Sequence, residues 1–97
     1  MSHTIRKVNL GNSALVEVTI VDYVQGGESF TLSELGLTGA LVSAFFLTSP
    51  GSLITPVLSG AKVILNNSAL AFIFNIGQEI ASQVGLNYTF FAIVHGT

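Results

Sequence analysis

Residues 14–23 read ALVEVTIVDY, and this stretch decides the fold class. Val16, Val18 and Ile20 are apolar, and the residues between them include a glutamate and a threonine. Alternation with a period of two is the pattern of a β-strand that buries one face and leaves the other outside the core. The stretch therefore predicts a strand whose core-facing side chains are Val16, Val18 and Ile20.

Outside this stretch, turn-forming Gly, Asn, Ser and Pro residues divide the chain into further short apolar segments. The predicted strands are 3–10, 14–23, 39–48, 53–58, 61–66, 68–75 and 86–95, with a further short strand near 79–81. Short strands separated in this way are typical of sandwiches and barrels. We predict a single all-β domain over residues 1–97, an antiparallel β-sandwich or jelly-roll-like fold of about seven or eight strands.

One helical signal interrupts the strands. Thr31 is followed by Glu34 at the spacing of a capping box, in which each side chain bonds to the backbone N–H of the other residue. Gly36 can end such a turn because glycine adopts a positive φ angle without steric cost. We therefore predict one short helical turn near 32–35.

Charged residues are scarce throughout the chain. The 97 residues include three Lys or Arg and five Asp or Glu, so that 8% of the residues are charged, against about 25% in a typical soluble domain. A domain of this size cannot bury all of its apolar surface internally. Contiguous exposed apolar patches usually mark interfaces. We therefore expect other subunits to cover part of the surface.

Several later strands are apolar on both faces, which supports this expectation. In 86–94, Phe90 and Val94 share one face, and Phe91 and Ile93 lie on the other. Each sheet of a small sandwich meets the internal core with only one face, so the second face needs either a partner subunit or loops of the same chain. The predicted interface residues are Ile5, Arg6, Lys7, Val8, Phe45, Phe72, Phe74, Phe90 and Phe91.

Residues 2–10 have two interpretations. Two of the three basic residues, Arg6 and Lys7, lie here between the apolar Ile5 and Val8. The segment can be a contact arm that adds as a strand to a neighbour's sheet edge, the first strand of the chain's own sheet, or partly both.

No residue pattern indicates catalysis, a cofactor or a metal site. A Ser–His–Asp set built from His95 and Asp22 has no supporting spacing and no G-x-S-x-G motif. A metal site using both His3 and His95 would require the two ends of the chain to meet. Glu28 and Glu34 fit a turn residue and a helix cap better than an acid–base pair. We therefore expect a protein that is not an enzyme.

Nucleic acid and membrane are also not expected partners. The formal charge is −2, and no basic cluster is present to neutralise phosphates. Lys62 and Asn66 interrupt the apolar 53–74 region, so no run of about 20 apolar residues is left to span a bilayer. The N-terminal residues show no apolar signal-peptide core.

Two segments carry a family resemblance. Residues 26–37, GGESFTLSELGL, follow the alternating strand, and residues 79–82, EIAS, precede the last strand, which finishes AIVHG at 92–96. The arrangement resembles a family of small virion proteins of tailed bacteriophages. In that family a GGE-[ST]-L-T-x-x-[DE]-L-G-L segment follows the second strand and an E-[VI]-A-x-G-x-D-L segment precedes the final one. The resemblance spans roughly 14–96, and the chain departs from it at 83–87, QVGLN.

The resemblance implies a capsid decoration or cement protein. Such a protein is made in the host cytoplasm and binds the major capsid protein on the outer surface of the virion. It also implies a homo-oligomer, with a trimer slightly favoured over a dimer. The alternatives are a phage tail, neck or spike component, or a soluble ligand-binding β module.

Overall fold

The structure is a computed structural model that describes residues 1–48, 54–59, 62–67 and 78–97. Within these ranges it contains strands and no helix, and every strand pairing is antiparallel. The strands are β1 (Ser2–Leu10), β2 (Ser13–Tyr23), β3 (Glu28–Ser29), β4 (Leu41–Leu47), β5 (Ile54–Ser59), β6 (Lys62–Asn67), β7 (Gln78–Glu79) and β8 (Gln83–Gly96). The all-β prediction is therefore confirmed.

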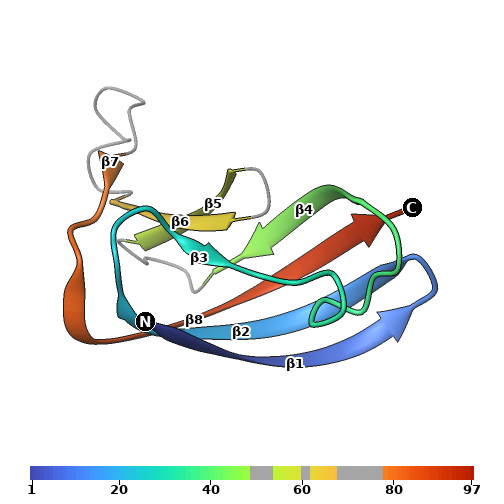
Figure 1. Ribbon diagram of the computed structural model, residues 1–97, viewed down its shortest axis with the longest axis horizontal. Coiled ribbons are helices and arrows are strands. Elements are labelled where there is room, and N and C mark those ends of the chain that lie inside the picture. The colour runs from blue at the N-terminus through green and yellow to red at the C-terminus, as the bar shows by residue number, and fades with distance from the viewer. Residues whose placement is uncertain (49–53, 60–61, 68–77) are drawn as a thin grey trace.

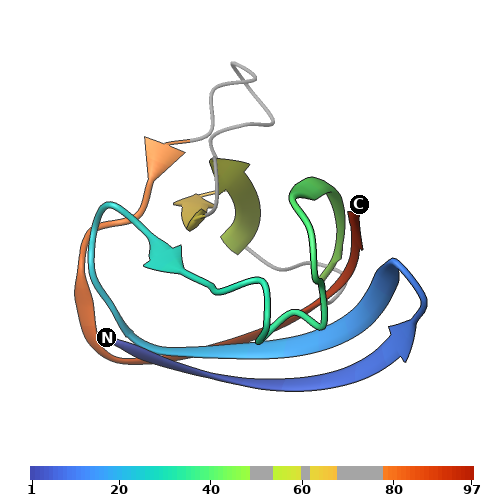
Figure 2. The same cartoon turned by 45° about the vertical axis from the view of Figure 1, so that its right-hand side comes forward.

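The strands form two four-stranded sheets. The large sheet has the order β1-β2-β8-β4, and the small sheet has the order β3-β6-β5, with β7 also paired to β6. Figure 1 shows the small sheet stacked over the large one. Figure 2 shows that the large sheet is curved and that the small sheet lies on its concave side. This two-layer arrangement is consistent with the predicted β-sandwich, and it leaves the convex face of the large sheet outside the internal core.

The register between β2 and β8 builds that core. Val16 lies opposite Ala92 and Val18 lies opposite Phe90, all four on the concave face, and each is buried. Burial of one Val or Phe side chain contributes about 1.5–3 kcal/mol to folding. The predicted core face of β2 is thus confirmed. The remaining buried core residues are Ala14, Ile20, Tyr23, Leu35, Leu37, Val63, Leu65 and Val94.

The predicted turn near 32–35 forms as a single hydrogen-bonded turn that does not continue into a helix. Both capping-box bonds are present: the Thr31 backbone N–H donates to Glu34 Oε2 at 2.8 Å, and the Glu34 N–H donates to Thr31 Oγ1 at 3.2 Å. Gly36 ends the turn with a φ of 78°. A Cβ at this position would collide with the side chain of Asn9, so glycine is required for both its conformation and its size. The turn places Leu35 and Leu37 in the core.

The N-terminal segment is a strand of the chain's own sheet. Residues Ser2 to Leu10 pair with β2 without interruption, and Ile5 packs against the buried core. The structure therefore shows residues 2–10 as the first strand of the chain's own sheet. β1 lies at one edge of the large sheet and β4 at the other.

Other strand boundaries differ from the predictions for local reasons. β3 was not predicted, because a strand of two residues has no periodicity to detect. β8 begins at Gln83, before the predicted residue 86, because the ladder continues past a bulge and pairs Tyr23 with Gln83. At the bulge, Asp22 has a φ of 56°, and its Oδ1 accepts the Gly85 N–H at 2.7 Å. The predicted strand 68–75 lies outside the described residues.

Tyr23 joins the two sheets through its hydroxyl group. The hydroxyl accepts the backbone N–H of Leu65 in β6 at 3.1 Å and donates to the Glu79 carboxylate in β7. The same carboxylate oxygen accepts the Gly26 N–H at 2.8 Å. Burial, reinforced by the bond to Glu79, raises the pKa of Tyr23 to about 12. The hydroxyl therefore keeps its proton at neutral pH and stays a donor to Glu79.

The core assignment predicts the effect of truncating Val18. Val18 is 2% exposed, so Val18→Ala should lower the free energy of unfolding by about 2 kcal/mol, the low end of the range for buried aliphatic truncations. The measurement is chemical denaturation followed by circular dichroism. Leu15→Ala is the matched control, because Leu15 is in the same strand but on the convex face and is 39% exposed. Leu15→Ala removes more side-chain atoms than Val18→Ala, yet it should lower the free energy of unfolding by less. A larger loss for Leu15→Ala than for Val18→Ala would contradict the face assignment.

Candidate functional site

The convex face of the large sheet carries an apolar row that crosses all four strands. Val8 lies opposite Leu15, Leu15 opposite Ile93, and Ile93 opposite Phe45. Residues directly opposite one another in antiparallel strands lie on the same face and have their Cβ atoms within about 5.5 Å. The four side chains therefore form one continuous strip from the β1 edge to the β4 edge.

The rows on either side of this strip contain few charges. One row holds Arg6, Glu17, Phe91 and Leu47, and the other holds Leu10, Ser13, His95 and Ser43. Arg6 Nη1 and Glu17 Oε1 are 3.9 Å apart at the surface, and an exposed pair of this kind contributes about 0–1 kcal/mol. The convex apolar face, as we name it, consists of Val8, Leu10, Leu15, Phe45, Leu47, Phe91 and Ile93.

These seven side chains are exposed to an unusual degree. Phe45 is 63% exposed, Val8 59% and Ile93 42%. All other described segments lie on the concave side of the large sheet (Figures 1 and 2), so none of them covers the convex face. A contiguous exposed apolar patch marks a surface at which a protein, a membrane or a ligand can bind, because leaving it in water is unfavourable.

The convex face also contains a surface hollow of about 220 Å³ near its β1 edge. Its apolar lining comes from Val8, Leu15 and Phe91, and its charged lining comes from Arg6, Lys7 and Glu17. An apolar floor with charged groups at the side can accept one side chain of a partner and orient it. We therefore treat the hollow as part of the candidate contact surface.

The structure divides the predicted interface residues into four groups. Arg6, Val8, Phe45 and Phe91 lie together on the convex face. Ile5 and Lys7 belong to the opposite face of β1. Ile5 packs on the core, and Lys7 Nζ donates to the Ser33 carbonyl at 2.8 Å. Lys7 also lines the hollow.

The prediction of Phe90 as an interface residue is corrected by the structure. It is 1% exposed and packs inside the chain's own core, because the register with β2 turns it to the concave side and turns its neighbour Phe91 to the convex side. Phe72 and Phe74 lie outside the described residues.

The residues of the Ser–His–Asp alternative do not come together. Ser13 Oγ and His95 Nδ1 share a hydrogen bond of 2.9 Å at one exposed end of the large sheet. Asp22 lies at the other end of β2, where its carboxylate accepts a hydrogen bond from the Gly85 N–H. His3 is likewise at the end of the sheet opposite His95, since it pairs with Ile20 rather than with the residues near Ser13. Within the described residues, no group of three or more His, Cys, Asp or Glu side chains is placed to hold a metal ion.

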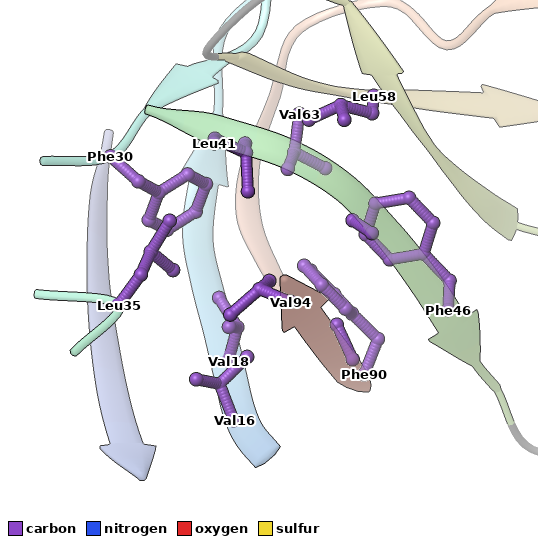
Figure 3. A pocket seen from close by; sticks show the side chains of 12 residues that line it. Val16, Val18, Phe30, Leu35, Leu41, Phe46, Leu58, Val63, Phe90 and Val94 are labelled. Atoms are coloured by element: carbon purple, nitrogen blue, oxygen red, sulfur yellow. The ribbon is translucent and has the colours of Figure 1, made fainter. Parts of the chain in front are cut away.

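The space between the two sheets is too small for a ligand. Figure 3 shows a cavity lined by apolar side chains of both sheets and of the 30–35 segment, among them Phe30, Phe46 and Phe90. Its volume of about 20 Å³ would admit one water molecule, which would find no polar partner there. The cavity is therefore a packing void. In the part of the chain that the structure describes, no helix is long and apolar enough to cross a membrane.

Sequence reasoning did not find an ionic cluster around His3, which we call the His3 clasp. His3 Nδ1 lies 3.0 Å from Glu28 Oε2, and His3 Nε2 lies 2.8 Å from Glu34 Oε1. The ring also packs on Phe30, with ring centroids 4.5 Å apart. Partial burial by itself would lower the pKa of His3, but the hydrogen bonds to the two carboxylates and their charges outweigh it and raise that pKa. The clasp ties the start of β1 to the 28–34 segment.

Comparison of the chain with protein-family models, curated proteins and solved structures found no match. The fold and the convex apolar face define this chain as a small β-sandwich with an exposed apolar sheet face among its described residues. The resemblance to phage virion proteins stays a prediction that rests on the two quoted segments.

The His3 clasp predicts a pH-dependent part of the stability. Because the pKa of His3 is raised by folding, its contribution is fully present below the unfolded value of about 6.5 and is lost as the pH rises through the folded pKa. The difference in melting temperature between the wild type and His3→Gln should therefore be largest near pH 6 and should shrink at higher pH. Differential scanning calorimetry at several pH values measures this difference.

His95→Gln is the control for this experiment, because the ring of His95 bonds to the hydroxyl of Ser13 and not to a carboxylate. This variant should keep the pH dependence of the wild type over the same range. If His3→Gln also followed the wild-type pH profile, the clasp would make no pH-dependent contribution to stability.

Proposed function

We propose that this chain is a non-enzymatic structural protein that decorates and stabilises a bacteriophage capsid, binding the major capsid protein lattice from the outside through its convex apolar face. The observation that carries the proposal is the strip formed by Val8, Leu15, Ile93 and Phe45, which crosses the whole large sheet and stays exposed. The identity of the partner is supported by the resemblance of the 26–37 and 79–82 segments to phage virion proteins.

The placement of the polar groups supports a structural function. Tyr23 and Glu79 tie the two sheets together, and His3 with Glu34 ties β1 to the capped turn. These groups are used within the fold. The convex face, in contrast, offers apolar area with one loose ion pair, which suits a permanent contact better than reversible binding of a charged ligand.

Quantitative mass spectrometry of purified particles tests the proposal directly. A capsid decoration protein is repeated with the symmetry of the lattice and should be present in on the order of hundreds of copies per particle. About a dozen copies or fewer would instead assign the chain to a tail, neck or spike. Absence from particles would overturn the proposal and favour a soluble β module.

A substitution on the convex apolar face should strongly weaken particle binding. Ile93 is in a central strand of the strip, so Ile93→Lys places a charge in the contact and should weaken binding by about 2 kcal/mol or more, the cost typical of a central interface residue, which is roughly thirty-fold in Kd. Co-sedimentation of the purified variant with particles lacking the protein measures this loss.

Thr89→Lys is the matched control, because Thr89 lies on the same strand and the same face but bonds to Thr19 in the polar part of the sheet. This variant should bind much more tightly than Ile93→Lys. Equal binding by both variants would show that the strip is not the contact surface.

Binding should also depend little on salt. The convex face holds Arg6 and Glu17 as a neighbouring pair of opposite charge, so its apolar contacts should provide most of the affinity. The Debye length falls from about 10 Å at 0.1 M to about 3 Å at 1 M salt, which would strongly weaken a contact that depends on charge. We expect co-sedimentation to be nearly unchanged between low and half-molar salt, and complete release at half-molar salt would contradict an apolar contact.

A further inference from the structure

The two edges of the large sheet differ in charge. The β1 edge carries Arg6 and Lys7 near its middle, whereas β4 reads LVSAFFL and carries no charged side chain. In the described part of the chain, β1 pairs only with β2, and β4 pairs only with β8. An edge strand of this kind leaves a row of backbone N–H and C=O groups free for another strand. Each edge is thus a possible site for strand addition, and the side chains decide which edge is suitable.

The charges on β1 oppose pairing between two copies of that strand. An antiparallel pair centred on Arg6 would place Arg6 opposite the same residue of the second copy. A shift of one residue would place Arg6 opposite Lys7 of that copy. Like charges directly opposite one another destabilise a ladder, and basic side chains on an edge are a common protection against edge-to-edge association. The β1 edge is therefore protected.

The β4 edge has no such protection, and it is where the apolar strip ends. Phe45 is the last residue of the row Val8–Leu15–Ile93–Phe45 and the most exposed of the four. If a two-fold axis passes through Phe45, this side chain meets its own copy, and the strip continues without a break across both large sheets. On the other face of β4, the small Ala44 then lies opposite the large Phe46. In this register the two exposed Phe45 rings contact each other, and each large Phe46 lies opposite a small Ala44.

We propose that β4 pairs antiparallel with β4 of a second copy of this chain, with Phe45 opposite Phe45. Because the β1 edge is protected, association stops at a closed two-fold dimer and does not continue into a fibre. A self-paired antiparallel strand has two-fold symmetry, so this dimer takes the place of the trimer that the family resemblance slightly favours. The dimer does not depend on capsid binding, although it would present two convex apolar faces on one continuous surface.

Cysteine cross-linking tests the edge and the register together, because the chain contains no cysteine of its own. Phe45→Cys should form a covalent dimer under mild oxidation, since residue 45 meets its own copy. Ser43→Cys is the matched control on the same face of the same strand. Its copy would lie four residues along the ladder, about 13 Å away, which is beyond the reach of a disulfide.

Val8→Cys provides the control for the other edge, because Val8 is exposed in β1. Dimer formation by Phe45→Cys alone is the expected result. Cross-linking of Ser43→Cys to the same extent would overturn the register, and cross-linking of Val8→Cys without Phe45→Cys would overturn the choice of edge.

Sedimentation of the chain without cysteine substitutions provides an independent measurement. The wild type at micromolar concentration should sediment at twice the 10.2 kDa mass of the chain. Phe45→Lys should sediment as a folded monomer, because two like charges then meet at the two-fold axis. A monomeric wild type would overturn the proposal, even if β4 paired with another protein in the particle. A dimer unaffected by Phe45→Lys would overturn it too.

Ile93→Lys separates this proposal from the proposed function. Ile93 lies in β8, one strand inside the β4 edge, so this variant should remain a dimer while its binding to particles is strongly weakened. A dimeric protein that never binds particles would count against capsid decoration but not against β4 pairing. A monomer that binds particles normally would count against β4 pairing but not against capsid decoration.

Discussion

From Ser13 to Val21, β2 pairs with β8 in one uninterrupted register, and the rest of the structure depends on this ladder. Both strands are central in the large sheet, and both carry large apolar side chains on their two faces. A slip of one residue would exchange the two faces of a strand. It would move Phe90 out of the core and replace it with Phe91. The register thus decides at once what fills the core and which apolar side chains remain on the convex face.

The few polar side chains with long-range partners hold the layers around this ladder. The Tyr23 hydroxyl connects the end of β2 to β6 and β7, and the His3 clasp connects β1 to the capped turn that carries Leu35 into the core. Buried polar groups must be hydrogen-bonded to be tolerated, and no buried side-chain nitrogen or oxygen lacks a partner among the described residues. The Tyr23 hydroxyl and the His3 clasp both lie away from the apolar strip of Val8, Leu15, Ile93 and Phe45, so they leave that strip without polar partners of its own.

A sheet with one apolar outer face and one unprotected edge is suited to assembly in two directions. The face can be covered by a broad partner surface, and the edge can extend the sheet through backbone hydrogen bonds. The two proposed contacts would share Phe45, at the end of the apolar strip, whereas Ile93 lies one strand inside the edge and belongs to the face alone. If both proposals hold, two linked convex faces would bind a repeating lattice more tightly than either face alone.

The sequence by itself determined the features that depend on neighbours in the chain. The alternation in 14–23 identified the core face of β2, the spacing of Thr31 and Glu34 identified the cap, and the low charge content indicated an incompletely covered surface. It also placed Phe90 and Phe91 on opposite faces. It could not say which of the two is buried, because both faces of that strand are apolar.

Only the tertiary structure decided which residues meet across long distances in the chain. It buried Phe90 against Val18, aligned Val8, Leu15, Ile93 and Phe45 into one strip, and brought His3 to Glu28 and Glu34. The physical reason is that a period of two is a local property of one strand. The choice of neighbouring strand, the register of the ladder and the side of the sheet that is covered come from contacts between segments far apart in the sequence, for which a single sequence carries no local signal.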